Sequence, residues 1–324
     1  MTDRRTLARL LATAVALGIA SVSPAIDSPQ AAPRLLGPGI VSTGENEFGP
    51  AFLPDGKTLF FCRTAPARSN YQAILVSRRV DGKWGTPSMA PFSGEWKDID
   101  PSISLDGKLI VFASNRPLNG GEARKDYDLW GVDRTAQGWS APRHLGPLVN
   151  SDGDETTTSI ASDGTLTLAS SRTGGKGRRD LYTSKSVDGV YQAAEPITSL
   201  NTEFDDSNQF IAPDQSFLVF ASDRGGKPPN ASSEFYLSLR KDGVFGEPRK
   251  LGAVVNGTTS VLTPTMTPDG KTFVFASFRG FADTPLGRPL SVREMSEKLR
   301  APGNGLGDLY EVDAAAVLDG VVTR

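Results

Sequence analysis

Short runs of apolar residues recur along the chain, and each of them follows directly after a turn built on aspartate. The turns lie at Asp55-Gly56, Asp106-Gly107, Asp163-Gly164, Asp214-Gln215 and Asp269-Gly270, with spacings of 51, 57, 51 and 55 residues. Asp-Gly between apolar runs is a strong hairpin signal, because both residues tolerate a positive φ. The spacing therefore predicts five similar units that are rich in β-strands.

The run after each turn is apolar at nearly every position rather than at alternate ones, as in 109–114, 217–222 and 273–277. A strand with two apolar faces must be covered on both, and sheets stacked around an axis provide that cover. A third strand and a looser fourth strand with a proline follow in most repeats, since proline is tolerated at an outer edge. The pattern predicts an all-β fold, a β-propeller of about five four-stranded blades.

The two ends of the chain are expected to meet. The fifth repeat ends at 308–313 without a fourth strand of this kind, and residues 33–37 match 142–146 of the second repeat in spacing. We therefore expect residues 33–42 to complete the last blade, which closes the ring and removes exposed strand edges. A degenerate sixth blade inside the long fifth repeat is the alternative.

Residues 280–307 interrupt the fifth repeat as an insertion. Within it, Ser291 and Glu294 have the spacing of a capping box, and Met295 and Leu299 follow at helical spacing. This pattern predicts a short helix on a surface loop.

The first 25 residues differ from the rest. Arg4, Arg5 and Arg9 precede an apolar run over 10–22, and small residues follow it at 23–25. That order is typical of a secretory signal peptide. We expect a signal peptide at 1–25, a short linker at 26–32, one propeller domain at 33–313 and a C-terminal tail at 314–324. The mature protein is then periplasmic or secreted and has no membrane span.

Composition narrows the classes of function. The 324 residues contain 35 Lys and Arg against 37 Asp and Glu, so no basic surface argues for nucleic acid. The single cysteine, Cys62, excludes an internal disulfide, and the single histidine, His144, excludes a metal held by several histidines. We expect no cofactor and no metal, and we expect a monomer.

Three segments of the second repeat resemble a known family. Residues 98–108, then Phe112-Ala113-Ser114-Asn115-Arg116, then Tyr127-Asp128-Leu129-Trp130, are similar to the PD40 repeat. That repeat is the WD40-like unit of the propeller in the Tol–Pal translocation factor and its relatives. The resemblance covers residues 33–313 and implies a propeller. Family members include binding modules, propellers fused to peptidoglycan-binding domains and propellers attached to peptidases, so a single function does not follow from it.

Four repeats place a carboxylate eight residues before the turn aspartate, just before the innermost strand. These residues are Glu47, Asp98, Glu155 and Asp206, and the fifth repeat has Val261 there. Radial symmetry would gather them near one mouth of the central channel. They could fix the loop that enters each blade, bind a cation or a basic partner segment, or catalyse hydrolysis as a pair of carboxylates.

A second correlation links arginines and carboxylates that occur together in the same four repeats. An arginine closes the second strand, and a carboxylate precedes the third. We expect one ion pair in each of these blades, because arginine forms bidentate bonds with carboxylates. The expected pairs are Arg116 with Asp128, Arg172 with Asp180, Arg224 with Glu234, and Arg279 with Asp308.

Two hypotheses for function remain after these observations. The first is a non-enzymatic module that binds a protein, peptide or glycan of the cell envelope, and we assign no catalytic residue. The alternative is a carbohydrate-active hydrolase that uses two of the four carboxylates at the channel mouth.

Overall fold

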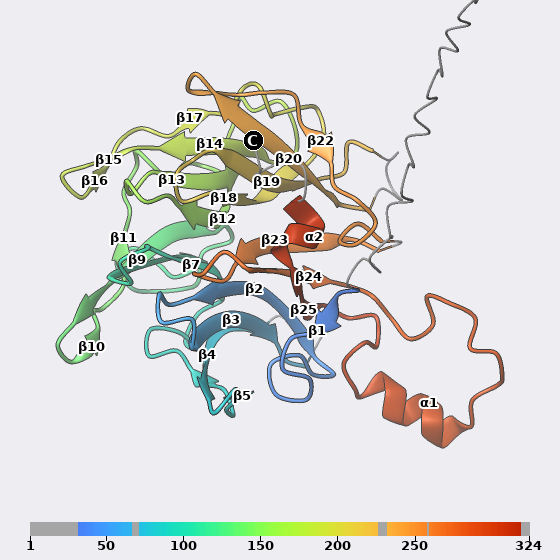
Figure 1. Cartoon of the computed structure of the whole chain (residues 1–324). Coiled ribbons are helices and arrows are strands. Elements are labelled where there is room, and N and C mark those ends of the chain that lie inside the picture. Colours follow the sequence, from blue (N-terminus) through green and yellow to red (C-terminus); the bar gives the residue numbers. More distant parts are fainter. Residues whose placement is uncertain (1–31, 67–70, 226–231, 258, 319–324) are drawn as a thin grey trace, which may run out of the picture. The chain divides into compact units, whose positions relative to one another are not determined.

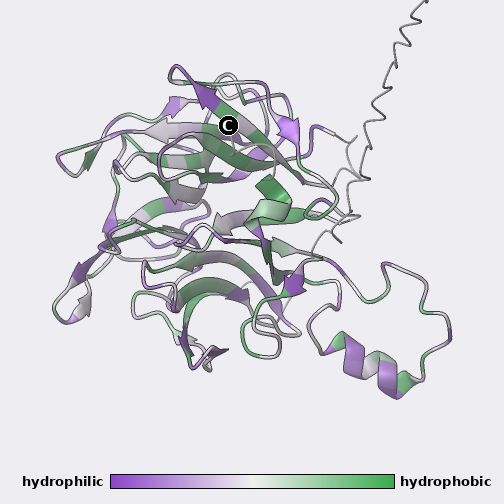
Figure 2. Ribbon diagram, in the orientation of Figure 1, coloured by the Kyte–Doolittle hydropathy of each residue, from purple (hydrophilic) through white to green (hydrophobic). Residues whose placement is uncertain are grey.

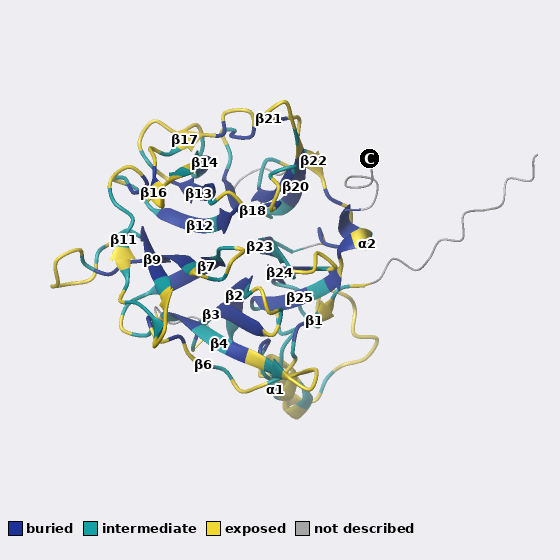
Figure 3. Cartoon of the chain, turned by 60° about the vertical axis from the view of Figure 1, so that its left-hand side comes forward, coloured by how far each residue is buried: buried dark blue, intermediate teal, exposed yellow. Residues whose placement is uncertain are grey.

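The computed structural model describes residues 32–66, 71–225, 232–257 and 259–318, which belong to one compact unit. Five antiparallel sheets are arranged around a common axis, with one strand of each sheet innermost (Figures 1 and 3). It is a five-bladed β-propeller. The predicted all-β fold and the number of blades are confirmed. The sixth blade is wrong, because residues 280–307 contain no strand and form one helix, α1 (Val292–Leu299).

The blades share one plan, in which three long strands are followed by short outer pairs. Blade 1 contains β2 (Asn46–Phe52), β3 (Thr58–Thr64), β4 (Gln72–Val80), β5 (Lys83–Trp84) and β6 (Ser88–Met89). Blade 2 contains β7 (Asp98–Ile103), β8 (Leu109–Ser114), β9 (Asp128–Thr135), β10 (Gly138–Trp139) and β11 (Arg143–His144). Blade 3 contains β12 (Glu155–Ile160), β13 (Leu166–Ser170), β14 (Asp180–Ser184) and β17 (Glu195–Pro196), with a hairpin of β15 (Ser186–Val187) and β16 (Val190–Tyr191).

The last two blades follow the same order. Blade 4 contains β18 (Asp206–Ile211), β19 (Phe217–Ser222), β20 (Glu234–Lys241), β21 (Val244–Phe245) and β22 (Arg249–Lys250). Blade 5 contains β23 (Val261–Met266), β24 (Thr272–Ser277), β25 (Asp308–Asp313) and β1 (Arg34–Leu35). The fourth strand is thus shorter than the sequence pattern indicates.

The N-terminal strand closes the ring, as predicted. In the antiparallel pair of β1 and β25, Arg34 lies opposite Glu311 and Leu35 opposite Tyr310. The backbone N–H of Leu36 adds a hydrogen bond of 2.8 Å to the carbonyl of Leu309. Blade 5 therefore joins residues from both ends of the described chain.

The second strand of each blade is buried on both faces, which explains its continuous apolar sequence. In β8, the consecutive residues Ile110, Val111, Phe112 and Ala113 are all inaccessible to solvent. Their side chains pack in clusters that join neighbouring blades. Burial of large apolar side chains between blades is the main force that holds such a ring together.

The two helices differ in character. In α1, Ser291 and Glu294 form the predicted capping box, and none of the helical residues is buried. It lies outside the sheets on a long loop and is mostly hydrophilic (Figures 1 and 2). The second helix, α2 (Ala314–Leu318), is hydrophobic in Figure 2, and its buried residues Ala314, Val317 and Leu318 pack against blades 4 and 5.

Candidate functional site

The four carboxylates expected at one mouth of the channel each begin an inner strand, but they are sealed inside their own blades. Glu47, Asp98, Glu155 and Asp206 are all 0% exposed. They accept hydrogen bonds from nearby hydroxyl groups, as Asp206 does from Ser222 Oγ at 2.6 Å. Burial raises the pKa of Glu47 and that of Glu155. Of the three roles considered from the sequence, the geometry matches the structural one, since the ring is not open to a ligand.

The arginines bind these same carboxylates, so the pairing predicted from the sequence is wrong in its partners. Nη2 of Arg116 lies 2.6 Å from Asp98, and Nη2 of Arg224 lies 2.6 Å from Asp206. Arg172 reaches Glu155 at 3.3 Å in the same way. Each guanidinium also stacks on aromatic rings of its blade.

Blades 1 and 5 show how the arrangement varies. In blade 1, Arg63 Nε lies 2.8 Å from Glu47; Arg63 lies within β3, whereas the arginines of blades 2 to 4 lie two residues after the end of the second strand. In blade 5, Val261 replaces the carboxylate, and Arg279 donates to the carbonyls of Val254 and Val255. Burial lowers the pKa of Arg279.

The carboxylates before the third strands have other partners. Asp128 binds Arg124 at 3.0 Å and His144 at 3.1 Å, and Glu234 binds a lysine. Asp180 accepts the backbone N–H of Lys176 at 2.6 Å. Asp308 accepts that of Gly303 at 2.7 Å, and its Oδ1 is buried without a hydrogen-bond partner. These groups fix the loops between the second and third strands.

Replacing Asp308 with asparagine is expected to stabilise the protein at pH 8 by about 1 kcal/mol. Burial, and secondarily the charge of Glu47, raises the pKa of Asp308 to about 7. Because this folded-state pKa lies above the unfolded value, the protonated carboxyl contributes stability that is lost as pH rises through 7. Urea unfolding from pH 5 to 8 measures the difference. Asp180→Asn is the control: its Oδ1 is also buried without a partner, but its Oδ2 accepts two backbone N–H groups where that of Asp308 accepts one, so we expect no gain at pH 8.

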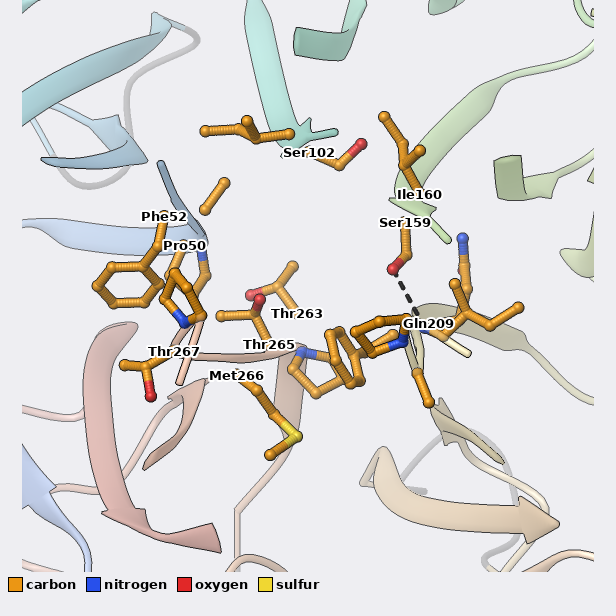
Figure 4. A pocket seen from close by; sticks show the side chains of 18 of the residues that line it. Pro50, Phe52, Ser102, Ser159, Ile160, Gln209, Thr263, Thr265, Met266 and Thr267 are labelled. Atoms are coloured by element: carbon orange, nitrogen blue, oxygen red, sulfur yellow. Dashed lines mark hydrogen bonds between the residues drawn. The ribbon is translucent and has the colours of Figure 1, made fainter. Parts of the chain in front are cut away.

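A pocket lies at the end of the inner strands opposite to the four sealed carboxylates. The pocket has a volume of about 880 Å³ and opens among the aspartate turns, and the inner strands of all five blades line it. Its walls are largely apolar, and Figure 4 shows Phe52, Ser102, Ile160 and Met266 around the same space. Helix α2 adds Ala314 and Leu318 to the wall. The four sealed carboxylates are not among the lining residues.

Five residues with positive φ form the narrow end of this pocket, one from each inner strand. They are Gly49, Asp100, Thr157, Asn208 and Thr263. At each of them the pairing between the first and second strands shifts as in a β-bulge. A bulge turns the residues that follow it, so it sets which side chains face the channel. We call these five residues the bulge ring.

Hydrogen bonds run around the bulge ring from blade to blade. The N–H of Gly49 donates to Thr263 Oγ1 at 3.0 Å, and that of Thr263 donates to Asn208 Oδ1 at 3.2 Å. The N–H of Asn208 donates to Thr157 Oγ1 at 3.3 Å, and the backbone of Thr157 interacts favourably with the Asp100 carboxylate. Four of the five bulge residues thereby present a side-chain oxygen to the backbone of the neighbouring blade, which couples the blades at the channel.

In blade 1 the acceptor is Cys62, because the ring residue Gly49 has no side chain. The N–H of Asp100 donates to Cys62 Sγ at 3.1 Å. A Cβ atom on Gly49 would lie 2.9 Å from that sulfur and 3.3 Å from the Cα of Asp100. The glycine therefore allows the sulfur to reach the next blade. Burial raises the pKa of the Cys62 thiol well above its usual value, and a buried thiol of this kind is unreactive.

Asp100 is the exceptional member of the bulge ring. It is 7% exposed, it lines the pocket, and its Oδ1 is buried without a hydrogen-bond partner. Burial raises its pKa to about 6, against the opposing effects of Arg179 and of the Thr157 N–H. A carboxylate in this condition is typical of functional sites.

Sequence reasoning missed the bulge ring, although a signal for it exists. Its members lie six residues before each turn aspartate, whereas the sequence analysis counted back eight and found the sealed carboxylates. Three of the five members, Gly49, Asp100 and Asn208, are of types that tolerate a positive φ. A proline follows in blades 1, 2 and 5, at Pro50, Pro101 and Pro264. Only the repeated position, not the residue type, identifies the two threonines.

Two further observations limit the chemistry of the described residues. They contain no cluster of three or more His, Cys, Asp and Glu side chains arranged to hold a metal ion. None of their helices is long and apolar enough to cross a membrane. The expected signal peptide at 1–25 and most of the linker lie outside the described residues.

Comparison with known proteins leaves the family open. No family model and no curated protein matches the chain. A TolB-like protein of Agrobacterium tumefaciens is 20% identical over 83% of this chain and 90% of its own, with a TM-score of 0.49. An α-L-arabinofuranosidase of Podospora anserina is 14% identical over 87% and 95%, with a TM-score of 0.48. A gluconolactonase of Xanthomonas campestris is 10% identical over 76% and 93%, at 0.42.

These likenesses to solved structures assign no function to the chain, because one fold hosts many functions. The PD40 resemblance stays a prediction from the sequence, and the function of this chain is argued from its own site.

Proposed function

We propose that this chain is an exported, non-catalytic binding module that holds part of its ligand in the central pocket. The observation that carries the proposal is the pocket itself, because the inner strands of all five blades contribute to its wall. Its volume of about 880 Å³ lies in the range of ligand pockets, roughly 300–1,000 Å³. Apolar walls with a few polar groups at the narrow end are also typical of such sites.

The ligand is a protein segment, a peptide or a glycan of the cell envelope, or a small molecule released there. Export rests on the signal peptide expected at 1–25, and residence in the periplasm or outside the cell follows from it. The resemblance of residues 98–130 to the PD40 repeat is consistent with a binding role. We expect the protein to act as a monomer.

The alternative of a carbohydrate hydrolase has less support. Such enzymes need two carboxylates across the scissile bond, about 5–5.5 Å apart for retention or roughly 6.5–9.5 Å for inversion. Glu47, Asp98, Glu155 and Asp206 are sealed in their blades. In the part of the chain that the structure describes, the carboxylates of the pocket lining are Asp100 and Asp214, and Asp214 lies in a turn where its Oδ1 accepts bonds from Ser216.

Filling the pocket is expected to abolish binding without unfolding the protein. Thr265 of β23 lines the channel and is partly exposed, so Thr265→Trp places an indole in the hollow (Figure 4). N-acetyl-dansylcadaverine serves as a neutral probe, because its fluorescence rises in apolar surroundings. We expect the wild type to bind the probe and the variant to bind it at least tenfold more weakly.

Thr135→Trp is the matched control, because Thr135 is exposed on β9 and does not line the pocket. Equal binding by both tryptophan variants would contradict a ligand site in the channel. Turnover of aryl glycosides by the wild type, lost on replacing one of the sealed carboxylates, would support the hydrolase instead.

A further inference from the structure

A lone carboxylate at the narrow end of the pocket carries an inference that rests on the proposed binding function and specifies its ligand. Asp100 belongs to β7, where its positive φ of 52° at the bulge places it in the ring that narrows the channel. The backbone N–H of Thr157, from the neighbouring blade, favours the charged form of the Asp100 carboxylate. Oδ1 lies close to Gly49, is buried and has no hydrogen-bond partner, and the residue as a whole is 7% exposed and lines the pocket.

A buried acceptor without a donor is costly, because it has lost its hydration and gained nothing in exchange. A cationic ligand that contacts the exposed part of Asp100 in the pocket would offset this cost by neutralising the carboxylate. A charged donor gives the stronger gain, since hydrogen bonds between an ammonium group and a carboxylate are shorter and stronger than neutral ones. The low dielectric of the narrow end strengthens this attraction further.

The pocket wall selects for positive charge. Among the described residues, the lining contains no lysine or arginine, and its two ionisable groups are Asp100 at the narrow end and Asp214 in a turn at the rim. Between them the wall is largely apolar, with Ile103, Ile160 and Met266 among its members. A ligand that satisfies both regions has an apolar body and one cationic end.

A metal ion matches the site less well than an organic cation. Calcium takes 6–8 oxygen ligands, and magnesium requires a near-octahedral set. The ring offers one carboxylate, and the side-chain oxygens of Thr157, Asn208 and Thr263 each already accept an N–H group. An ammonium group needs only a few acceptors around its three N–H donors.

We propose that Asp100 anchors the protonated amine of a ligand whose apolar body fills the central pocket. The ligand class is a primary or secondary amine, free or at the end of a peptide. The Asp100 carboxylate binds the amine, the apolar wall binds the body, and the bulge ring limits how deeply the ligand enters.

The test compares two probes that differ only at the amine. Dansylcadaverine has a free primary amine, and its N-acetyl form is neutral at the same atom. At pH 8 we expect the wild type to bind the free amine about tenfold more tightly or better. In Asp100→Asn, which preserves the shape of the side chain, the ratio of the two affinities should fall to near one, while the neutral probe still binds.

The pH dependence gives an independent readout on the unaltered protein. Asp100, with its pKa raised to about 6 by burial, loses its charge as pH falls from 8 to 5. The other groups that interact with it keep their charge over this interval: the pKa of Tyr127 is raised to about 12, that of Cys62 well above its usual value, and that of Arg179 is also raised. The preference for the free amine should therefore disappear at pH 5.

Each other outcome overturns a distinct statement. If the wild type binds both probes equally and Thr265→Trp loses this binding, the pocket is supported as the ligand site and recognition of the amine by Asp100 is refuted. A preference that persists in Asp100→Asn or at pH 5 would place the amine elsewhere. Calcium binding by calorimetry that requires Asp100, without a preference for the amine, would replace the organic cation with a metal ion. Binding of neither probe would refute the proposed function itself.

Discussion

Replacing Asp206 with valine is expected to lower the free energy of unfolding by about 3–5 kcal/mol, because it leaves a buried guanidinium without its carboxylate. Asp206 is fully buried and lies 2.6 Å from Arg224, whose side chain is 16% exposed. Valine reproduces the residue that blade 5 has at the equivalent position, Val261. Urea unfolding measures the loss.

A second substitution separates the ion pair from packing. In Asp206→Val with Arg224→Met, no charge stays buried, so we expect part of the loss to be recovered. Glu203→Ala, an exposed carboxylate in the same loop, is the control and should change stability by less than about 0.5 kcal/mol. If the double variant is as unstable as Asp206→Val, the uncompensated charge is not the cause.

Replacing Gly49 with alanine is expected to cost about 2–5 kcal/mol, the sum of a strained φ and a steric conflict. Its φ is 60°, and a Cβ there would lie 2.9 Å from Cys62 Sγ and 3.3 Å from the Cα of Asp100. The backbone of the next blade cannot move away without breaking the hydrogen bond from the Asp100 N–H to that sulfur.

Gly56→Ala provides a matched comparison within the same blade. Its φ of 62° is nearly identical, but a Cβ there would meet no atom within 4 Å. It should therefore show the cost of the φ alone, about 1–2 kcal/mol. Equal losses for the two variants in urea unfolding would mean that the contact between blades at Gly49 contributes nothing.

The fold was predictable because it depends on features that repeat. Five aspartate turns at similar spacing indicated five blades, and a continuous apolar run indicated a strand covered on both faces. Closure was predictable because residues 33–37 resemble a fourth strand that the fifth repeat lacks. The helix in the insertion followed from local chemistry, the capping box of Ser291 and Glu294.

The ion pairs were not predictable in their partners, because co-occurrence shows that two residues belong to one arrangement and not that they touch. Arg116 and Asp128 are both present in blade 2, but Arg116 folds back over Phe112 to reach Asp98. The first repeat seemed to lack the pair because it uses Arg63, which lies directly opposite Glu47 in the neighbouring strand.

The pocket was not predictable from alternation along a strand. A bulge adds one residue to the inner strand and changes which of the following side chains face the axis. Counting eight residues back from each turn aspartate therefore identified the inner strands, but it selected the sealed carboxylates instead of the residues that line the pocket. The role of Asp100 depends on its neighbours in three dimensions, above all on Thr157 of the next blade and on the lack of a donor at Oδ1.

The pairing of β1 with β25 also determines how the protein would respond to mechanical load. The two ends of the described chain enter the ring through the same blade. The contact between them includes two residue pairs and a few hydrogen bonds that link Leu309 with Leu36 and Ser42. Tension on a tether at either terminus would act first on this short ladder, while the longer ladders of the other four blades carry little of the force. The strands β1 and β25 would then separate before the strands of any other blade, and the ring would open at blade 5.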